Sequence, residues 1–116
     1  MSDNRVKKVA FVDNKLSRAF EELKSGKFQD KQLAAEIDNA INQLKGNPLC
    51  GIKIEKRLWP KEYITRYAID NLRKYDLRNG WRLLYTLAGN QIEIVAILLE
   101  WFDHKNYERR FGYKSR

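Results

Sequence analysis

Arginine and aromatic residues recur along the segment from Arg73 to Trp101, and their spacing would place several of them on one face of a β-sheet. In the simplest register, that face collects Arg73, Tyr75, Arg82 and Trp101. Guanidinium groups bind phosphate through paired hydrogen bonds, and aromatic rings stack on nucleic-acid bases. The pattern therefore predicts a surface that binds a ligand with both phosphates and bases.

The single histidine, His104, is the natural candidate for acid–base chemistry, because an unperturbed imidazole has a pKa of about 6.5. It follows Asp103, which can cap a short C-terminal helix. Tyr107 and Phe111 share its face of that helix, at positions i+3 and i+7. We therefore expect Tyr107 either to reach the same ligand or to pack the helix onto the sheet.

A surplus of positive charge favours an acidic partner. The chain of 116 residues holds 23 Lys and Arg against 15 Asp and Glu, a net charge of +8. Residues 53–82 carry nine cations and four anions, and residues 101–116 carry five and two, whereas residues 83–100 carry two anions and no cation. Nucleic acid or an acidic protein fits this distribution. A membrane surface fits it poorly, because no amphipathic basic helix carries the charge.

The scarce residue types exclude several kinds of site. Cys50 is the only cysteine, so no disulfide can form within the chain and no cysteine-based zinc site can be built. A reducing cytoplasm is therefore the expected location. With one histidine, we expect neither a metal nor a cofactor. The longest apolar stretch, residues 94–99, is too short to span a membrane, and no signal-type run occurs near the N-terminus.

The elements that must position these residues follow from apolar spacing and turn residues. Apolar residues three and four positions apart predict two helices, one starting at residue 13 or 14 and ending at Ser25, the other running from near Asp30 to Gly46. We expect strands at residues 6–12, 71–78, 81–87 and 91–100, and short helices at residues 61–68 and 104–110. The order predicts a single α+β domain over residues 1–116, with the N-terminal strand and helical hairpin on one face of a small, mostly antiparallel sheet. A basic tail begins at about residue 112.

Two turn signals set the expected strand pairing. Asn79-Gly80 favours a two-residue type I′ turn, and Gly89-Asn90 marks a second turn. A bulge or a longer loop would instead bring Lys74 and Arg78 onto the face of Arg82. The opposite face is expected to lie under the two helices and comprises Trp81, Leu83, Tyr85, Leu87, Ile92, Ile94, Ala96 and Leu98.

Two segments carry a family resemblance. The hairpin reads NGWRLLY at residues 79–85, and the C-terminal region reads ILLEWFDHKNYERRFGY at residues 97–113. Both resemble the RelE/ParE toxin superfamily of bacterial and archaeal toxin–antitoxin systems, whose hairpin has a glycine, an aromatic residue, an arginine, two aliphatic residues and a tyrosine. The resemblance covers about residues 6–113 and implies a RelE-like fold.

The resemblance also implies a reaction. Members similar to RelE are metal-independent ribonucleases that cut mRNA in the ribosomal A site, by attack of the 2′-hydroxyl on the adjacent phosphate. By this resemblance Arg82 would bind phosphate, and Tyr107 would match the C-terminal tyrosine of the family. Arg73 or Lys74, depending on register, would match a lysine of the preceding strand.

The chain departs from the family at the end of its last strand. RelE-like enzymes carry an arginine there, where this chain has Trp101. Several related toxins use histidine and aromatic residues instead, and His104 with Trp101 would fill those roles. The candidate catalytic residues are therefore Arg82, His104 and Tyr107, and the candidate RNA-binding residues are Arg73, Lys74, Arg78, Trp101, Lys105 and Arg109.

The resemblance implies partners as well as a reaction. We expect a cognate antitoxin that forms a hetero-oligomer with this chain, and mRNA on the ribosome as substrate. One alternative is a ParE-like toxin that inhibits DNA gyrase by protein binding. Another is a catalytically degenerate member that binds only RNA or an antitoxin.

Overall fold

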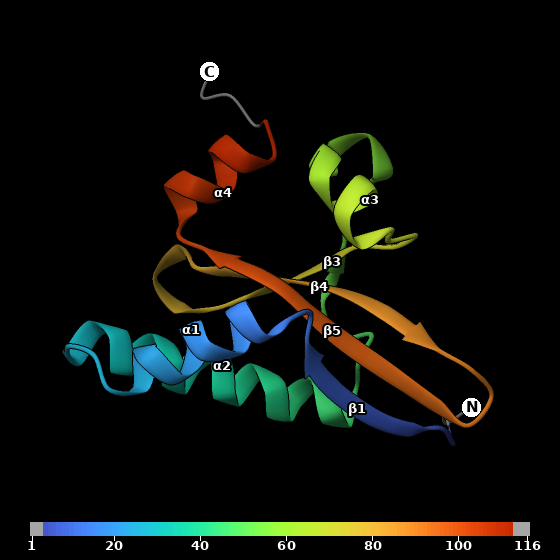
Figure 1. Ribbon diagram of the computed structural model, residues 1–116, viewed down its shortest axis with the longest axis horizontal. Helices are drawn as coiled ribbons and strands as arrows, with labels where there is room; N and C mark the ends of the chain where they lie inside the picture. The colour runs from blue at the N-terminus through green and yellow to red at the C-terminus, as the bar shows by residue number, and fades with distance from the viewer. Residues whose placement is uncertain (1–3, 113–116) are drawn as a thin grey trace.

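The computed structural model describes residues 4–112 and contains a five-stranded sheet with helices on both sides (Figure 1). The strands are β1 (Val6–Phe11), β2 (Ile52–Lys53), β3 (Arg73–Asp76), β4 (Arg82–Gly89) and β5 (Glu93–Phe102). The helices are α1 (Asn14–Lys24), α2 (Phe28–Gly46), α3 (Lys61–Tyr67) and α4 (His104–Arg110), with 3₁₀ turns η1 (Lys56–Leu58) and η2 (Arg78–Gly80). Among the described residues, no helix is long and apolar enough to cross a membrane.

The strand order is β1-β5-β4-β3-β2, with β1 parallel to β5 and the other pairs antiparallel. This arrangement confirms the predicted α+β fold. The sequence did not predict β2, because it is only two residues long and lies in the connector before α3. Helix α2 begins at Phe28, slightly before the expected start, because Asp30 caps its first turn by accepting a hydrogen bond from the Lys27 backbone N–H at 3.2 Å.

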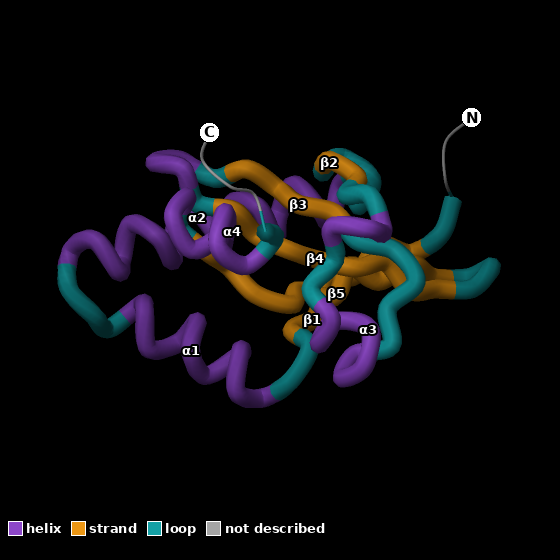
Figure 2. The backbone as a smooth tube through the Cα atoms, turned by 90° about the horizontal axis from the view of Figure 1, so that it is seen from above, coloured by secondary structure: helices purple, strands orange, loops and turns teal. Residues whose placement is uncertain are grey.

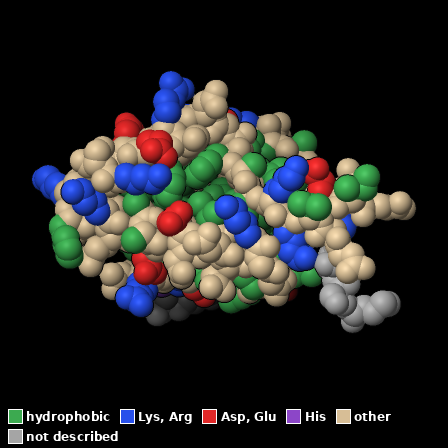
Figure 3. All heavy atoms as spheres, turned by 90° about the horizontal axis from the view of Figure 1, so that it is seen from below, with side chains coloured by type: hydrophobic (Ala, Val, Ile, Leu, Met, Phe, Trp, Pro, Cys, Tyr) green, Lys and Arg blue, Asp and Glu red, His purple; other side chains and the backbone are tan. Residues whose placement is uncertain are grey.

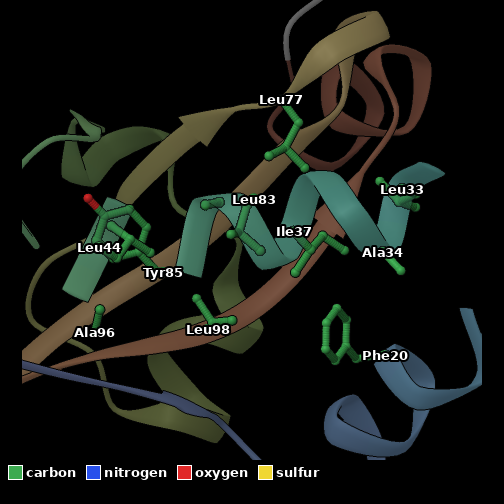
Figure 4. Close-up of a cluster of buried hydrophobic side chains, with 11 residues drawn as sticks. Phe20, Leu33, Ala34, Ile37, Leu44, Leu77, Leu83, Tyr85, Ala96 and Leu98 are labelled. Atoms are coloured by element: carbon green, nitrogen blue, oxygen red, sulfur yellow. The ribbon is translucent and has the colours of Figure 1, made fainter. Parts of the chain in front are cut away.

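Helices α1 and α2 cover one face of the sheet and bury an apolar cluster beneath them (Figure 4). Asp13 starts α1 by accepting a hydrogen bond from the Leu16 backbone N–H at 2.8 Å. Burying one Leu or Ile side chain contributes about 1.5–3 kcal/mol, so this cluster supplies much of the stability. Its buried members, the first cluster, are Phe20, Leu33, Ala34, Ile37, Ala40, Leu44, Leu77, Leu83, Tyr85, Ala96 and Leu98.

The outer surface of this helical layer is mixed in character. Seen from the side on which α1 and α2 lie, apolar side chains gather at the middle of the face, and charged side chains of both signs surround them (Figure 3). The stripes predicted from spacing nevertheless face the sheet, where Phe20, Ile37 and Leu44 are buried.

Helices α3 and α4 lie on the opposite face, where the sequence predicted an open surface (Figure 1). Seen from above, they lie over different parts of the sheet, and the end with the β4–β5 turn extends beyond both (Figure 2). The expectation of an open face is wrong wherever these helices pack. Their buried contacts, the second cluster, are Ile54, Tyr63, Leu72, Leu84, Leu99, Tyr107 and Phe111.

The β3–β4 connection has three loop residues instead of the predicted two. The Leu77 backbone N–H donates to the Trp81 carbonyl at 2.8 Å, and Asp76 pairs with Arg82. Asn79 and Gly80 both take positive φ, at 59° and 79°. These two residues therefore do form a turn, as predicted, but within a loop that is one residue longer. This register buries Leu77 against the first cluster, which a two-residue loop would have prevented.

The β4–β5 connection is also longer than expected, but its effect on the faces differs. The Asn90 side chain closes the loop by accepting from the backbone N–H groups of Ile92 and Glu93 at 2.8 and 2.9 Å. The pairing shifts by an even number of residues, so Ile94, Ala96 and Leu98 stay on the α1–α2 side as predicted. Ile92 does not, because it lies in the turn and is 74% exposed.

An irregularity in β5 reverses the faces at the end of the last strand. Pairing shifts between Leu84 and Tyr85, so that Leu84 faces Glu100 and Leu83 faces Trp101. Trp101 therefore packs against the first cluster, and Glu100 takes its expected place on the other face. The prediction that Trp101 shares a face with Arg82 is wrong.

Candidate functional site

Lys74, Asp76 and Arg82 form a charged group at the junction of β3 and β4. The Asp76 carboxylate oxygen Oδ1 lies 3.0 Å from Lys74 Nζ and 3.1 Å from Arg82 Nε. Arg82 also donates from Nη1 to the Gly80 carbonyl at 2.6 Å. The side chains of Lys74 and Arg82 are less than one fifth exposed. The guanidinium is thus held by a hydrogen bond to the Gly80 carbonyl and by an ion pair with Asp76.

The ring of Tyr107 lies against both cations. Its centroid is 5.3 Å from Arg82 Cζ and 5.8 Å from Lys74 Nζ, distances typical of cation–π contacts. Tyr107 is 4% exposed and stacks on Phe111 at 4.7 Å. Asp103 caps α4 by accepting from the Asn106 backbone N–H at 2.8 Å. The cap starts α4 directly after β5, which brings the ring over the ends of β3 and β4.

His104 joins this group through the β3–β4 loop. A Cβ built on Gly80 would lie 3.1 Å from the Cβ of His104, so the loop backbone and the histidine are in close contact. The histidine side chain is 61% exposed, and its Nε2 lies 3.5 Å from Glu108 Oε1. Gly80 therefore connects His104 with Arg82, and the three candidate catalytic residues lie together with Lys74.

Three candidate RNA-binding residues lie elsewhere. Arg73 points away from Arg82 and donates from Nη1 to the carbonyls of Leu49 and Gly51 at 3.2 and 2.8 Å. Arg78 pairs with Glu36 of α2, at 3.5 Å between Nε and Oε2. Trp101 packs under α1 and α2. The register therefore selects Lys74, and not Arg73, as the β3 cation beside Arg82.

Lys105 and Arg109 lie on the exposed surface of α4. Arg109 lines a shallow hollow together with Phe102, Asn106 and Arg110. These two cations add positive charge to the exposed side of α4. Their RNA-binding role stays a prediction.

The sequence did not predict a second polar group, which fastens α4 to α3 and β5. Arg110 forms an ion pair with Glu62 of α3 and lies 3.6 Å from Glu100 of β5. Burial raises the pKa of Glu100 above its ordinary value. Burial also raises the pKa of the Tyr63 phenol, as does the neighbouring Glu100 carboxylate. The only sequence signal was Glu100 itself, a carboxylate that directly follows the apolar run of residues 94–99.

The end of β5 on the face of Arg82 therefore carries the acid Glu100, and Trp101 lies on the other face. Within residues 4–112, no three His, Cys, Asp or Glu side chains are placed to hold a metal ion together. The available chemistry consists of Lys74 and Arg82 as phosphate ligands, His104 as an acid or base, and a tyrosine ring behind the cations.

Comparison with known proteins identifies one family. A search of curated proteins and of solved structures finds no significant match. The family model described as ParE toxin of type II toxin-antitoxin system, parDE, matches residues 12–99. The match includes Lys74 and Arg82 and ends before His104 and Tyr107. Because it spans well over half of the sequence, the chain belongs to this ParE toxin family, within the RelE/ParE superfamily of type II toxin–antitoxin systems.

Proposed function

We propose that this toxin cleaves mRNA on the ribosome, without a metal, at the group formed by Lys74, Arg82 and His104. The observation that carries the proposal is their convergence: two mostly buried cations, joined through Asp76, lie beside the Gly80 loop that contacts the exposed His104, although the three residues come from β3, β4 and α4. Membership of the family implies an antitoxin partner. The positive charge of this region would serve both RNA and that partner.

The reaction would be an attack of the ribose 2′-hydroxyl on the adjacent phosphorus. A base removes the hydroxyl proton, the new P–O bond closes a cyclic phosphate, and the 5′-oxygen leaves with a proton. His104 is suited to one of the two proton transfers, because its side chain is exposed and it contacts Gly80, whose carbonyl accepts a hydrogen bond from Arg82. Lys74 and Arg82 would stabilise the extra negative charge on the phosphate oxygens in the transition state.

Tyr107 would be a positioning residue in this reaction. Its ring is buried beneath the cations, so it would hold Lys74 and Arg82 in place and leave contact with RNA to them. Asp76 fixes the same two side chains from the other direction. Preorganised cations need not rearrange when the transition state forms, which lowers the barrier.

Dependence on the ribosome follows from what the site lacks. Trp101, the ring expected to stack on a base, lies on the other face of the sheet. Without it, free RNA would bind mainly through its phosphates, in many geometries. A ribosome that presents mRNA in a bent conformation would supply the missing orientation.

The test is to map mRNA 5′ ends by primer extension after adding the protein to translating ribosomes, with naked mRNA as control. We expect cuts at defined codon positions on ribosomes and few cuts on naked mRNA. Absence of cuts on ribosomes, with the protein folded and free of antitoxin, would overturn the proposal.

The second candidate function is inhibition of DNA gyrase by protein binding. It is favoured by the ParE family match and by the acid Glu100 at the end of β5, which would repel RNA phosphates. A supercoiling assay with purified gyrase separates the two. Inhibition of supercoiling, together with a DNA-damage response and intact mRNA in cells, would support this function over RNA cleavage.

A further inference from the structure

The β3–β4 loop contacts both Arg82 and His104. The Gly80 carbonyl accepts a hydrogen bond from Arg82 Nη1 at 2.6 Å, and a Cβ built on Gly80 would lie 3.1 Å from the Cβ of His104. Both residues belong to the proposed cleavage site. The position of Gly80 therefore affects the guanidinium and the histidine together.

The hairpin itself holds this loop mainly at its ends. The Leu77 N–H donates to the Trp81 carbonyl at 2.8 Å, and the Trp81 N–H donates to the Arg78 carbonyl at 3.3 Å. Between these bonds, Asn79 takes a left-handed φ of 59°, a conformation that is uncommon for a residue with a side chain. Such a conformation persists where the surrounding structure supports it. The support of this loop must therefore come partly from another element.

Glu36 of α2 supports the loop from outside the hairpin. Its Oε1 accepts a hydrogen bond from the Arg78 backbone N–H at 3.1 Å, and its Oε2 lies 3.5 Å from Arg78 Nε. Within residues 4–112, no other residue outside the hairpin makes a hydrogen bond or an ion pair with residues 78–80. The Glu36 carboxylate thus fixes the first residue of the loop.

A hollow lies beneath the loop, which makes this hydrogen bond more important. Arg78 and Asn79 line the hollow on the loop side, Glu36 lines it on the α2 side, and Trp81 and Trp101 line it at the sheet. Because side chains do not fill this space, apolar packing does not fix the loop there. The carboxylate therefore provides the support that packing provides elsewhere beneath α2.

Helix α2 gives Glu36 a rigid base. Leu33, Ile37 and Ala40, one turn before, beside and one turn after Glu36, are buried in the first cluster, and Figure 4 shows Leu33 and Ile37 on this helix. The backbone at Glu36 cannot shift without disturbing that core. The Glu36 side chain is only 28% exposed, which limits competition from water for its oxygens.

We propose that Glu36 is a positioning residue of the cleavage site and acts on it from the opposite face of the sheet. This inference rests on the proposed function. The carboxylate fixes the Arg78 backbone N–H, and the loop then holds Gly80 where it orients Arg82 and packs on His104. The backbone hydrogen bond carries the effect, because the Arg78 side chain is 85% exposed and its ion pair is weakened by water.

Three variants separate the backbone hydrogen bond from the charge and from the Arg78 side chain. Glu36→Ala removes the acceptor. Glu36→Gln removes the charge but keeps an oxygen that can accept from the same N–H. Arg78→Ala removes the ion pair but keeps the N–H. The matched control is Asp38→Ala, which removes a carboxylate from an exposed position of α2.

The first measurement needs no RNA. Nuclear magnetic resonance of the isotope-labelled full chain follows the amide of residue 78, the Arg82 Nε–H and the ring of His104, the only histidine. In Glu36→Ala we expect faster amide hydrogen exchange at residue 78 and shifted signals of Arg82 and His104. In the other three variants, the signals of Arg82 and His104 should stay close to those of the unmodified protein. Unshifted signals of both residues in Glu36→Ala would overturn the proposal.

The second measurement is cleavage of mRNA at a series of ribosome concentrations. Glu36→Ala should lower the maximal rate by about tenfold, because loss of one hydrogen bond to a charged group leaves Arg82 less well oriented. The half-saturating ribosome concentration should change by less than about twofold, because the cations that bind RNA are still present. Glu36→Gln should restore the rate to within about threefold of the unmodified protein. Thermal unfolding checks that every variant folds.

The outcomes distinguish the positioning role from the proposed function. If the unmodified protein cleaves mRNA on ribosomes and Glu36→Ala cleaves as fast as Asp38→Ala, the positioning role is overturned and the cleavage function stands. If the unmodified protein does not cleave, the cleavage function is overturned and the positioning role with it. Signal shifts in Glu36→Ala would then show only that Glu36 orders the β3–β4 loop.

Discussion

The two faces of the sheet are covered by layers of different chemistry. Beneath α1 and α2, the buried residues of the first cluster are aliphatic or aromatic, and none is charged. Beneath α3 and α4, Tyr63 and Tyr107 lie against the charged side chains of Arg110, Lys74 and Arg82. Burying a charge costs free energy unless it is paired, so the second face is less favourable for stability. The difference indicates that the face under α1 and α2 supplies most of the stability of the fold. The face under α3 and α4 carries the candidate functional site.

The largest expected effect is on the free energy of unfolding, and it tests whether the face under α1 and α2 dominates stability. Ile37→Ala should lower the free energy of unfolding by about 2–5 kcal/mol, because Ile37 is completely buried between α2 and the sheet. Ile64→Ala on α3 is the matched control, since Ile64 is 41% exposed and its loss should cost about 0.5 kcal/mol or less. Urea denaturation measures both. Similar losses in the two variants would show that the first face does not dominate stability.

The next effect tests the second face. Arg82→Ala should reduce RNA cleavage on ribosomes by about a hundredfold, because a preorganised cation near the phosphate is lost. Arg78→Ala is the control: it removes the same charge four residues away, on the α2 side. Primer extension measures cleavage, and thermal unfolding checks that both variants fold. Equal cleavage by the two variants would contradict a site at Arg82.

These two predictions depend on the helices and on the strand register, and the sequence predicted the helices better than the register. Helices α1 and α2 were readable because their apolar spacing and the Asp13 cap are local signals. Strand register was not, because Asn79-Gly80 suits loops of two or three residues and only the burial of Leu77 decides between them. A one-residue shift exchanged Arg73 for Lys74 beside Arg82.

The end of β5 shows a second limit of the sequence. No glycine or proline in β5 marks the position of the bulge that moves Trp101 to the α1–α2 side. It allows Leu98 and Trp101, which are three residues apart, both to pack on the first cluster. Arg82 and Tyr107 were still predicted to share a site, because the hairpin and the start of α4 are local motifs. Glu100 and Arg110 were missed, since their pairing depends on how α3 packs.

A smaller effect on cleavage is expected from changes at Tyr107, and it tests how this ring acts on the second face. If the ring holds Lys74 and Arg82 by cation–π contact, Tyr107→Phe should keep cleavage within about threefold of the unmodified protein. Tyr107→Leu should lose about tenfold, because the aromatic face is gone. Single-turnover cleavage on ribosomes compares them. A Phe variant as poor as the Leu variant would mean that the phenolic hydroxyl itself takes part in the reaction.

The smallest effect concerns the stability of the second face as a function of pH. Burial raises the pKa of Glu100, so the folded protein binds a proton there at higher pH than the unfolded chain does. The stability contributed by this group is therefore present below the ordinary glutamate pKa and is lost as the pH rises through the raised value. Glu100→Gln cannot titrate. Relative to it, the unmodified protein should lose unfolding free energy over that pH range, as measured by denaturation at a series of pH values.

The control for this comparison is Glu21→Gln on α1, where Glu21 is exposed and pairs with Lys24. Its difference from the unmodified protein should not follow the same pH course, because Glu21 is not desolvated. A pH course for Glu100→Gln that runs in the opposite direction would mean that Arg110 stabilises the Glu100 carboxylate more than burial opposes it. The charges of the second face would then stabilise the fold, and α4 would be held over Lys74 and Arg82 by electrostatic attraction.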